Sequence, residues 1–250
     1  MKALVTGASS GIGYEISKYL SKLGYDIIAV ARNEEKLKEL KKECSTNVEI
    51  ILLDLSVYEN LVKLYMQISD QNIDILVNNA GFGAFGEFKD IDIDKEVKMI
   101  NTNVVAVDVL TKLFLKDMVK KDSGKILNVA SIAGFMPGPL MSSYYASKAY
   151  VVRLSQAIYK ELKIKKSNVG ISILCPGPVN THFNDVAGVK FNIKPLNSEY
   201  VAKYAVDNML KNKNIIIPGI LNKFIRFFSK IVPDKIMMYF AYKAQMKKVE

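Results

Sequence analysis

The chain has 250 residues, half of them hydrophobic, with seven prolines, two cysteines and one histidine. This composition is typical of a globular protein and excludes a disordered one. The spacing of Cys44 and Cys175 fits neither a disulfide nor a metal site, which indicates a protein of the reducing cytoplasm. The single histidine, His182, argues against a Ser-His-Asp triad or a His-rich zinc site. We therefore expect no metal. The formal net charge is +10, but lysines and glutamates are mixed on the predicted helices and no nucleic-acid-binding motif is visible, so we expect no nucleic-acid partner either.

Short apolar runs alternate with helical patterns along the chain. The runs predict strands at 2–5, 26–31, 49–53, 73–78, 125–130, 170–175 and 215–218. Helical periodicity predicts helices at about 11–23, 34–43, 57–69, 94–121, 143–165 and 198–211. Strands that are apolar throughout belong to parallel sheets, so we expect one α/β domain over residues 1–219: a Rossmann-like doubly wound parallel sheet flanked by helices. No signal peptide or bilayer-spanning run is visible.

The first predicted strand runs into a glycine-rich turn, TGASSGIG, at residues 6–13. Glycines there permit a tight turn and let the backbone approach a pyrophosphate, which the following helix N-terminus attracts. The spacing is GxxxGxG rather than the commoner GxGxxG, and a chance glycine turn is the alternative. We expect this turn to bind a dinucleotide through Gly7, Ser9, Ser10, Gly11, Ile12 and Gly13.

The second predicted strand ends without an acidic residue. An Asp or Glu at this point would bind the ribose hydroxyls of NAD, whereas Arg32 follows the strand here, and a guanidinium can pair with a 2′-phosphate. The sequence therefore predicts NADP(H), although a solvated arginine at a helix start is the alternative. Asp54 follows the third strand and could bind the adenine amino group; its alternative role is to cap a helix that begins at Val57.

Tyr144 and Lys148 are four residues apart, so they lie on one face of a predicted helix. A phenol titrates at ~10 in water, and a neighbouring ammonium favours the phenolate and lowers its pKa. Tyr144 could then act as a general acid or base, while Ser131 donates to a substrate oxygen. Tyr145 lies beside Tyr144, but the residue four positions later is Ala149, so no cation lowers its pKa in the same way.

Four motifs stand in a fixed order: TGxxxGxG at 6–13, NNAG at 78–81, Ser131 with Tyr144-x-x-x-Lys148, and PGPVNT at 176–181. In this order they resemble the motifs of the short-chain dehydrogenase/reductase family, and the resemblance covers residues 1–220. It implies an NADP-dependent enzyme that moves a hydride between the cofactor and a carbonyl/secondary alcohol pair. The resemblance implies the catalytic residues Asn103, Ser131, Tyr144 and Lys148.

The resemblance also assigns roles around these four residues. Asn103 is preferred to Asn101 by its distance from the helix end, and it would hold a water near Lys148, which anchors the nicotinamide ribose. The NNAG motif would stabilise the sheet, and Thr181 would bind the nicotinamide carboxamide. Beyond the glycine turn and Arg32, cofactor contacts are expected from Asp54, Asn79, Ala80, Gly81, Tyr144, Lys148, Pro176, Gly177, Val179 and Thr181.

Several side chains near the motifs have two interpretations. His182 could contact substrate or lie at the surface. Four apolar residues could line a substrate pocket or belong to the core, and Phe135, soon after Ser131, has the strongest case for the pocket. The four are Phe82, Phe85, Phe135 and Met141. They are the basis for expecting an apolar or acyl-like substrate.

The C-terminal extension at 220–250 departs from the family pattern. It contains seven Lys/Arg and two Asp/Glu, and Pro233 divides it into two predicted helices. Apolar residues recur at helical spacing at Leu221, Phe224, Ile225, Phe228 and Ile231. We expect this face to be buried by the substrate cleft, by a second subunit or by a lipid interface, and we favour the first two over peripheral membrane contact.

The helices at 94–121 and 143–165 resemble those that pair across a twofold axis in this family, which favours a homodimer and leaves a tetramer open. A protein of another class remains the alternative function: a low-turnover nucleotide-sensing or membrane-attached binding protein on the same fold. The intact Ser/Tyr/Lys/Asn set argues for the enzyme, because a binding protein would not need it.

Overall fold

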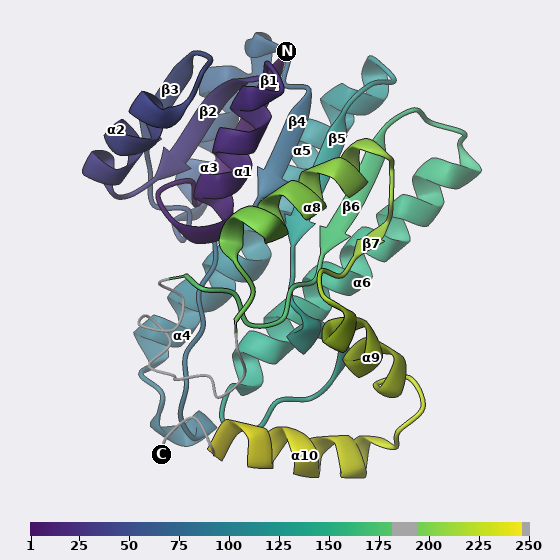
Figure 1. Ribbon diagram of the computed structural model, residues 1–250. Helices are drawn as coiled ribbons and strands as arrows, with labels where there is room; N and C mark the ends of the chain where they lie inside the picture. Colours follow the sequence, from purple (N-terminus) through teal and green to yellow (C-terminus); the bar gives the residue numbers. More distant parts are fainter. Residues whose placement is uncertain (182–194, 247–250) are drawn as a thin grey trace.

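The computed structural model describes residues 1–181 and 195–246. One sheet has the strand order β3-β2-β1-β4-β5-β6-β7, and every neighbouring pair is parallel (Figure 1). The strands are β1 (Lys2–Thr6), β2 (Asp26–Ala31), β3 (Val48–Leu52), β4 (Ile75–Asn78), β5 (Lys125–Val129), β6 (Gly170–Leu174) and β7 (Ile215–Ile216). The predicted doubly wound sheet is confirmed, and its order reverses between β1 and β4, where such sheets bind ligands.

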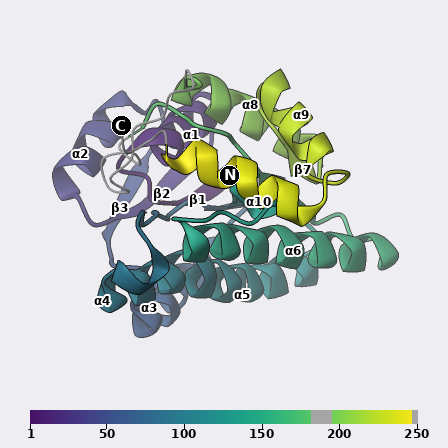
Figure 2. The same cartoon turned by 90° about the horizontal axis from the view of Figure 1, so that it is seen from below.

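Helices cover both faces of this sheet (Figure 2). They are α1 (Gly11–Lys22), α2 (Glu34–Glu43), α3 (Tyr58–Ile68), α4 (Ile93–Ile100), α5 (Ala106–Lys120), α6 (Ser142–Ile164), α8 (Ser198–Leu210), α9 (Ile220–Phe228) and α10 (Asp234–Met246). Short turns are η1 (Ser69–Gln71), η2 (Phe88–Asp90), η3 (Asn101–Val105) and η4 (Ile132–Phe135). Helices α1, α2 and α8 form one layer, and α3, α5 and α6 form the other.

Each helical layer closes its own hydrophobic core. On one face, Ile16 of α1 and Leu37 of α2 are fully buried against the strands. On the other face, Leu64 of α3 and Phe114 of α5 are buried in the same way. Burying one such side chain stabilises the fold by about 1.5–3 kcal/mol, so the two cores hold the strand ends in fixed positions.

The predicted helix at 94–121 differs in one detail. Instead of a single α-helix, α4 and α5 are joined by the π turn η3, in which the N–H of Ala106 bonds to the carbonyl of Asn101, five residues earlier. Such π turns occur mostly as single inserted turns in α-helices, often at functional sites. This one contains Asn103, which is fully buried and bonded to the backbone of Phe82.

The predicted strand at 215–218 is shorter than expected. Only Ile215 and Ile216 pair with β6, because β6 ends at Leu174 and Pro218 has no N–H with which to extend the ladder. The chain then continues into α9 and α10, which flank Pro233 as predicted. Both helices lie at the carboxyl end of the strands, and α10 crosses that end (Figures 1 and 2). No helix in the described ranges is both long and apolar enough to cross a bilayer.

Candidate active site

The carboxyl ends of the strands open into a cleft of about 1840 Å³. Its walls come from the glycine turn after β1, the ends of β2 and β5, the first turns of α6, and the helices α9 and α10. Of the predicted site residues, all line this cleft except Gly13 and Asn103. Asn103 bonds to the backbone of Phe82, and Gly13 packs against Gly7 and Asn79; these three partners line the cleft.

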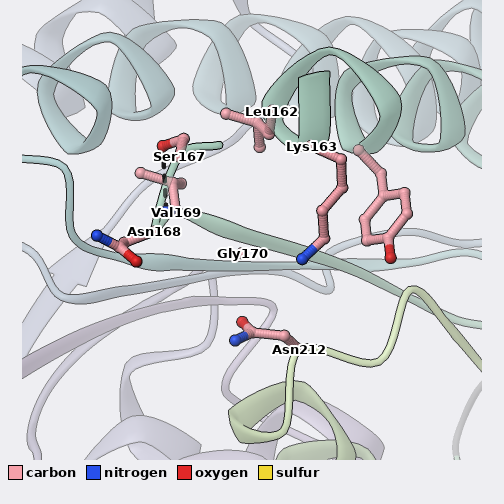
Figure 3. Close-up of a pocket in the computed structure, with 8 residues that line it drawn as sticks. Leu162, Lys163, Ser167, Asn168, Val169, Gly170 and Asn212 are labelled. Atoms are coloured by element: carbon pink, nitrogen blue, oxygen red, sulfur yellow. Dashed lines mark hydrogen bonds between the residues drawn. The ribbon is translucent and has the colours of Figure 1, made fainter. Parts of the chain in front are cut away.

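A much smaller cavity of about 110 Å³ lies at the opposite end of β6 (Figure 3). It is lined by Lys163, Ser167, Asn168 and Asn212 among others, together with Gly170, the first residue of β6. None of the predicted site residues contributes to it. The predicted chemistry therefore belongs to the large cleft.

The glycine turn has the backbone that its sequence predicts. Gly7 and Gly11 adopt positive φ angles of 65° and 56°, which side chains with a Cβ rarely adopt. A Cβ on Gly13 would collide with the carbonyl oxygen of Gly7 and the side chain of Asn79. A Cβ on Gly11 would lie 2.7 Å from Cγ2 of Thr181. The turn is thus a backbone cradle that fits a pyrophosphate at the N-terminus of α1.

The NNAG motif locks this cradle to the sheet. The amide of Asn79 donates to the carbonyl oxygens of Thr6 (3.0 Å) and Gly7 (3.1 Å). In return, the hydroxyl oxygen of Thr6 accepts the backbone N–H of Asn79 and of Ala80. Asn78 donates to Asn128 Oδ1 on β5 at 2.9 Å, so the motif stabilises the central sheet as the resemblance implies.

The end of β2 presents Arg32 to the solvent. Its guanidinium is 75% exposed and lies 3.8 Å from the Asp54 carboxylate. A surface pair of this length contributes little stability, so the side chain can turn toward a phosphate. Asp54 does not cap α3, because its Oδ1 accepts from the N–H and hydroxyl of Ser56, whereas Val57 holds the cap position without a side-chain bond. Partial burial opposes ionisation, yet the bonds from Ser56 and the Arg32 charge keep the pKa of Asp54 below its ordinary value.

The reacting groups meet where β5 ends and α6 begins. Ser131 lies two residues after the end of β5, and its hydroxyl hydrogen-bonds the Tyr144 phenol. The same hydroxyl oxygen accepts the N–H of Ala133 at 3.1 Å, which fixes its direction. Lys148 lies one helical turn after Tyr144, with its Nζ 5.9 Å from the phenol ring centroid. The predicted constellation is therefore assembled in space, on two elements with packed cores behind them.

The electrostatics of this cluster differ from the expectation. Burial raises the pKa of Tyr144 well above that of a free phenol, so the expected lowering by Lys148 is not found. Burial also lowers the pKa of Lys148 to about 8, because loss of solvent penalises the charged ammonium. The Lys148 ammonium instead donates to the carbonyl oxygen of Val129 at 3.0 Å. At neutral pH the site thus holds a protonated phenol beside an ammonium.

Asn103 lies behind the cleft wall, next to this cluster. Its Oδ1 accepts the N–H of Phe82, and its Nδ2 donates to the Phe82 carbonyl and to the hydroxyl of Ser147. Ser147 in turn donates to the Tyr144 carbonyl at 2.7 Å. Ser147 is not among the predicted site residues, although its place between Tyr144 and Lys148 on one helix was the available signal. Its bonds tie η3 to α6.

Several apolar side chains line the cleft near Tyr144, and the candidate pocket residues divide between this lining and the core. Phe82 and Met141 line the cleft, whereas Phe135, the favoured candidate, does not. Phe135 instead lies under the guanidinium of Arg226 at 3.9 Å from its ring centroid, and so supports α9. Phe85 also lies outside the lining and packs in the core cluster around Tyr144.

Helix α10 closes one side of the cleft. Gln245 is 1% exposed, and its amide donates to the Tyr145 hydroxyl at 2.8 Å. Its carbonyl oxygen is buried and has no partner among the described residues. This contact anchors the far end of α10 to α6. Gln245 is not among the predicted site residues, because nothing in the local sequence pattern places it over the site.

The segment Pro176–Thr181 forms the remaining wall and lines the cleft with four of the predicted cofactor residues. The carbonyl of Pro176 accepts the N–H of Ile132 at 2.9 Å, which fixes the segment against η4. His182 lies outside the described residues. Within the described ranges, no three His, Cys, Asp or Glu side chains gather as a metal site requires.

The comparison with protein families agrees with this geometry. The family model for short chain dehydrogenases matches residues 1–189. The chain belongs to the short-chain dehydrogenase/reductase family. An uncharacterized oxidoreductase of Staphylococcus epidermidis is 34% identical over 181 residues, covering 72% of this chain and 78% of the relative. A very-long-chain 3-oxoacyl-CoA reductase of Anas platyrhynchos is 31% identical over 246 residues, covering 94% of this chain and 77% of the relative.

Solved structures of short-chain dehydrogenases share the whole fold. One from Sphingobium yanoikuyae in complex with NADPH has a TM-score of 0.81 at 26% identity, covering 93% of this chain and 96% of the other. One from Burkholderia phymatum in complex with NAD has the same TM-score at 24% identity and covers 92% of each chain. At this identity the likeness supports the fold only. The chain is therefore an oxidoreductase of this family, and these two solved relatives hold nicotinamide cofactors.

Replacing Lys148 by methionine should stabilise the cofactor-free protein at pH 7 by about 1–3 kcal/mol, because the pKa of the buried ammonium falls from 10.5 to about 8 on folding. Between pH 8 and 10.5 the Lys148 side chain is protonated in the unfolded chain but neutral in the folded chain. The free energy of unfolding of the wild type therefore increases as the pH rises from 8 to 10.5. Urea unfolding of wild type and Lys148→Met at pH 7 and pH 9 measures both effects. A methionine variant that is less stable at pH 7 contradicts the burial argument.

Proposed function

We propose that this protein transfers a hydride between NADP(H) and a carbonyl/secondary alcohol pair. One observation carries the proposal: Ser131, Tyr144 and Lys148 meet in the same cleft as the glycine cradle. The cofactor supplies the hydride when bound, and the chain supplies position and a proton.

Each polar group then has a defined task. The raised pKa of Tyr144 keeps its phenol protonated at neutral pH, which suits a general acid in carbonyl reduction. The Ser131 hydroxyl holds the substrate oxygen while charge develops on it. The ammonium of Lys148 offsets the charge left on Tyr144 when the proton leaves, and Asn103 positions the backbone of Phe82 behind the site.

Two features support NADP(H) over NAD(H). The end of β2 carries the exposed Arg32 and no acid that would bind ribose hydroxyls. The dehydrogenase of Sphingobium yanoikuyae, which shares the fold, holds NADPH. The remaining cofactor contacts are assigned to the residues of the glycine turn, the NNAG motif and Pro176–Thr181.

The substrate is proposed to be apolar or acyl-like. Its side of the cleft is lined by Phe82, Met136, Met141, Leu221 and Ile225. The relative from Anas platyrhynchos is named as a reductase of very-long-chain 3-oxoacyl-CoA, which agrees with an acyl substrate. We assign the catalytic unit to residues 1–219 and the cleft-closing extension to residues 220–250. The free thiols of Cys44 and Cys175 support a reducing, cytoplasmic location.

A panel of ketones and 3-oxoacyl thioesters, followed by NADPH absorbance, tests this function. We expect turnover with at least one apolar carbonyl compound, and faster turnover with NADPH than with NADH. A protein that binds NADPH but turns over no member of the panel would instead be the low-turnover binding protein that the sequence leaves as the alternative.

We further propose a homodimer through α4, α5 and α6. On α4, Ile93, Val97 and Ile100 are exposed by 67%, 46% and 39% and share one helix face. Such a face on a closed twofold contact would be buried against its own copy. Sedimentation should show a dimer at micromolar concentration, and Val97→Glu should dissociate it. A wild-type monomer under these conditions contradicts the assignment.

A further inference from the structure

Helix α9 turns its apolar side away from the protein. Its outward residues are 53–72% exposed, although they include three phenylalanines. They are Ile220, Leu221, Phe224, Phe227 and Phe228. Helices of water-soluble proteins bury their apolar face against the core, so this orientation is the reverse of the ordinary one.

Polar contacts on the inner side fix this orientation. Asn222 is 6% exposed, and its amide donates to the Pro218 carbonyl at 2.8 Å. Its side chain also packs against Gly177, where a Cβ would collide with it. Arg226 lies over the ring of Phe135, and burial lowers the pKa of its guanidinium. A rotated α9 would lose these contacts, so the outward apolar face is built into the fold.

The exposed apolar surface continues into α10. Ile231, between the helices, is 62% exposed, and Tyr239 and Phe240 of α10 are 54% and 61% exposed. Helix α10 buries only Ala241 and Gln245. Both helices stand at the end of the molecule where the cleft lies (Figures 1 and 2). We call the exposed side chains of α9 and α10 the C-terminal apolar surface.

Positive charge accompanies this surface. Residues 220–246 contain five Lys/Arg and one acid, Asp234. Lys223, Lys230, Lys235 and Lys243 are exposed, and none of them forms an ion pair with a residue that the structure describes. Apolar side chains bordered by unpaired lysines are typical of helices that bind anionic lipid interfaces.

The charge pattern disfavours a second copy of the chain as the partner. Protein interfaces are depleted of lysine, and a twofold contact would bring the same lysine-rich surface against itself. The exposed face of α4 differs in this respect, because α4 carries two lysines and two acids. The two apolar surfaces therefore call for different partners.

The C-terminal apolar surface borders the cleft, because Leu221 and Phe240 belong to both. Leu221 and Ile225 of α9 and Phe240 of α10 line the cleft. We propose that α9 and α10 form a docking surface for an anionic membrane, and that the cleft takes its apolar carbonyl substrate from that membrane. The second half of this proposal rests on the proposed function, whereas the docking itself does not.

Flotation of the full chain with vesicles tests the docking. Wild type should float with vesicles of phosphatidylcholine mixed with phosphatidylglycerol, less with phosphatidylcholine alone, and less as salt is raised. The variant Phe224→Glu/Phe228→Glu should lose at least ~10-fold in vesicle affinity, because each phenylalanine contributes apolar burial. Neither residue lines the cleft. Phe88→Glu, at an equally exposed phenylalanine on η2, is the matched control and should float like wild type.

Three results would overturn the docking proposal. Wild type could fail to float, or the double variant could float as well as wild type. The double variant could also sediment as a smaller species than wild type, which would assign the surface to a second copy. NADPH affinity measured on the same samples shows whether each variant is folded. If wild type floats but no carbonyl compound is reduced, the docking stands and the proposed function fails.

Discussion

Replacing Tyr144 by phenylalanine should lower turnover by at least ~100-fold and leave NADPH affinity nearly intact. The phenol is the one proton donor at the site that is hydrogen-bonded to Ser131 and one helical turn from Lys148. Phenylalanine keeps the ring and its packing but removes the proton. The loss should therefore appear in kcat rather than in cofactor binding, as expected for an interaction made in the transition state.

Tyr150 offers a matched control on the same helix, because it is 42% exposed and does not line the cleft. Tyr150→Phe should keep wild-type turnover. Steady-state rates with a confirmed carbonyl substrate, and calorimetry with NADPH, measure the two quantities. Wild-type turnover in Tyr144→Phe would show that the proton comes from another group.

Replacing Arg32 by alanine should weaken NADPH binding roughly 10- to 100-fold and leave NADH binding unchanged. A charge-assisted contact to the 2′-phosphate contributes about 1.5–3 kcal/mol, and NADH lacks that phosphate. The substitution should cost the protein without cofactor little stability, because the ion pair between Arg32 and Asp54 is exposed and 3.8 Å long. The effect is therefore specific to one cofactor.

Calorimetry is the suitable measurement, because the chain has no tryptophan to report binding by fluorescence. Arg153→Ala removes another exposed arginine, on α6 and outside the cleft, and should change neither affinity. Equal affinities of the wild type for the two cofactors, or a preference that survives in Arg32→Ala, would remove Arg32 from the cofactor site.

The sequence predicted the elements whose signals are local. Strands that are buried on both faces appear as continuous apolar runs in the sequence, and the spacing of the glycines predicts the turn after β1. The four-residue spacing of Tyr144 and Lys148 placed them on one helix face. The π turn at Asn101–Val105 could not be predicted, because it accompanies bonds between Asn103 and the distant backbone of Phe82.

Features that depend on burial were the hardest to predict. The spacing of Tyr144 and Lys148 does not reveal that both are buried, and it is burial that raises the phenol pKa and lowers that of the ammonium. The apolar spacing of α9 is visible in the sequence, but the direction of its face is decided by Asn222 and Arg226 on the other side. We expected that face to be buried, and in the isolated chain most of it is exposed.

Transfer of deuterium from NADPH that carries deuterium at both C4 positions of the nicotinamide is the measurement that decides the proposed hydride transfer. Wild-type protein, given the best carbonyl compound of the panel, should place one deuterium on the carbinol carbon of the alcohol product. Mass spectrometry of the product measures it, and Tyr144→Phe should form the same labelled product at least ~100-fold more slowly. An alcohol product without deuterium, or tight NADPH binding with no labelled product from any carbonyl compound, would rule out hydride transfer from NADPH to a carbonyl substrate.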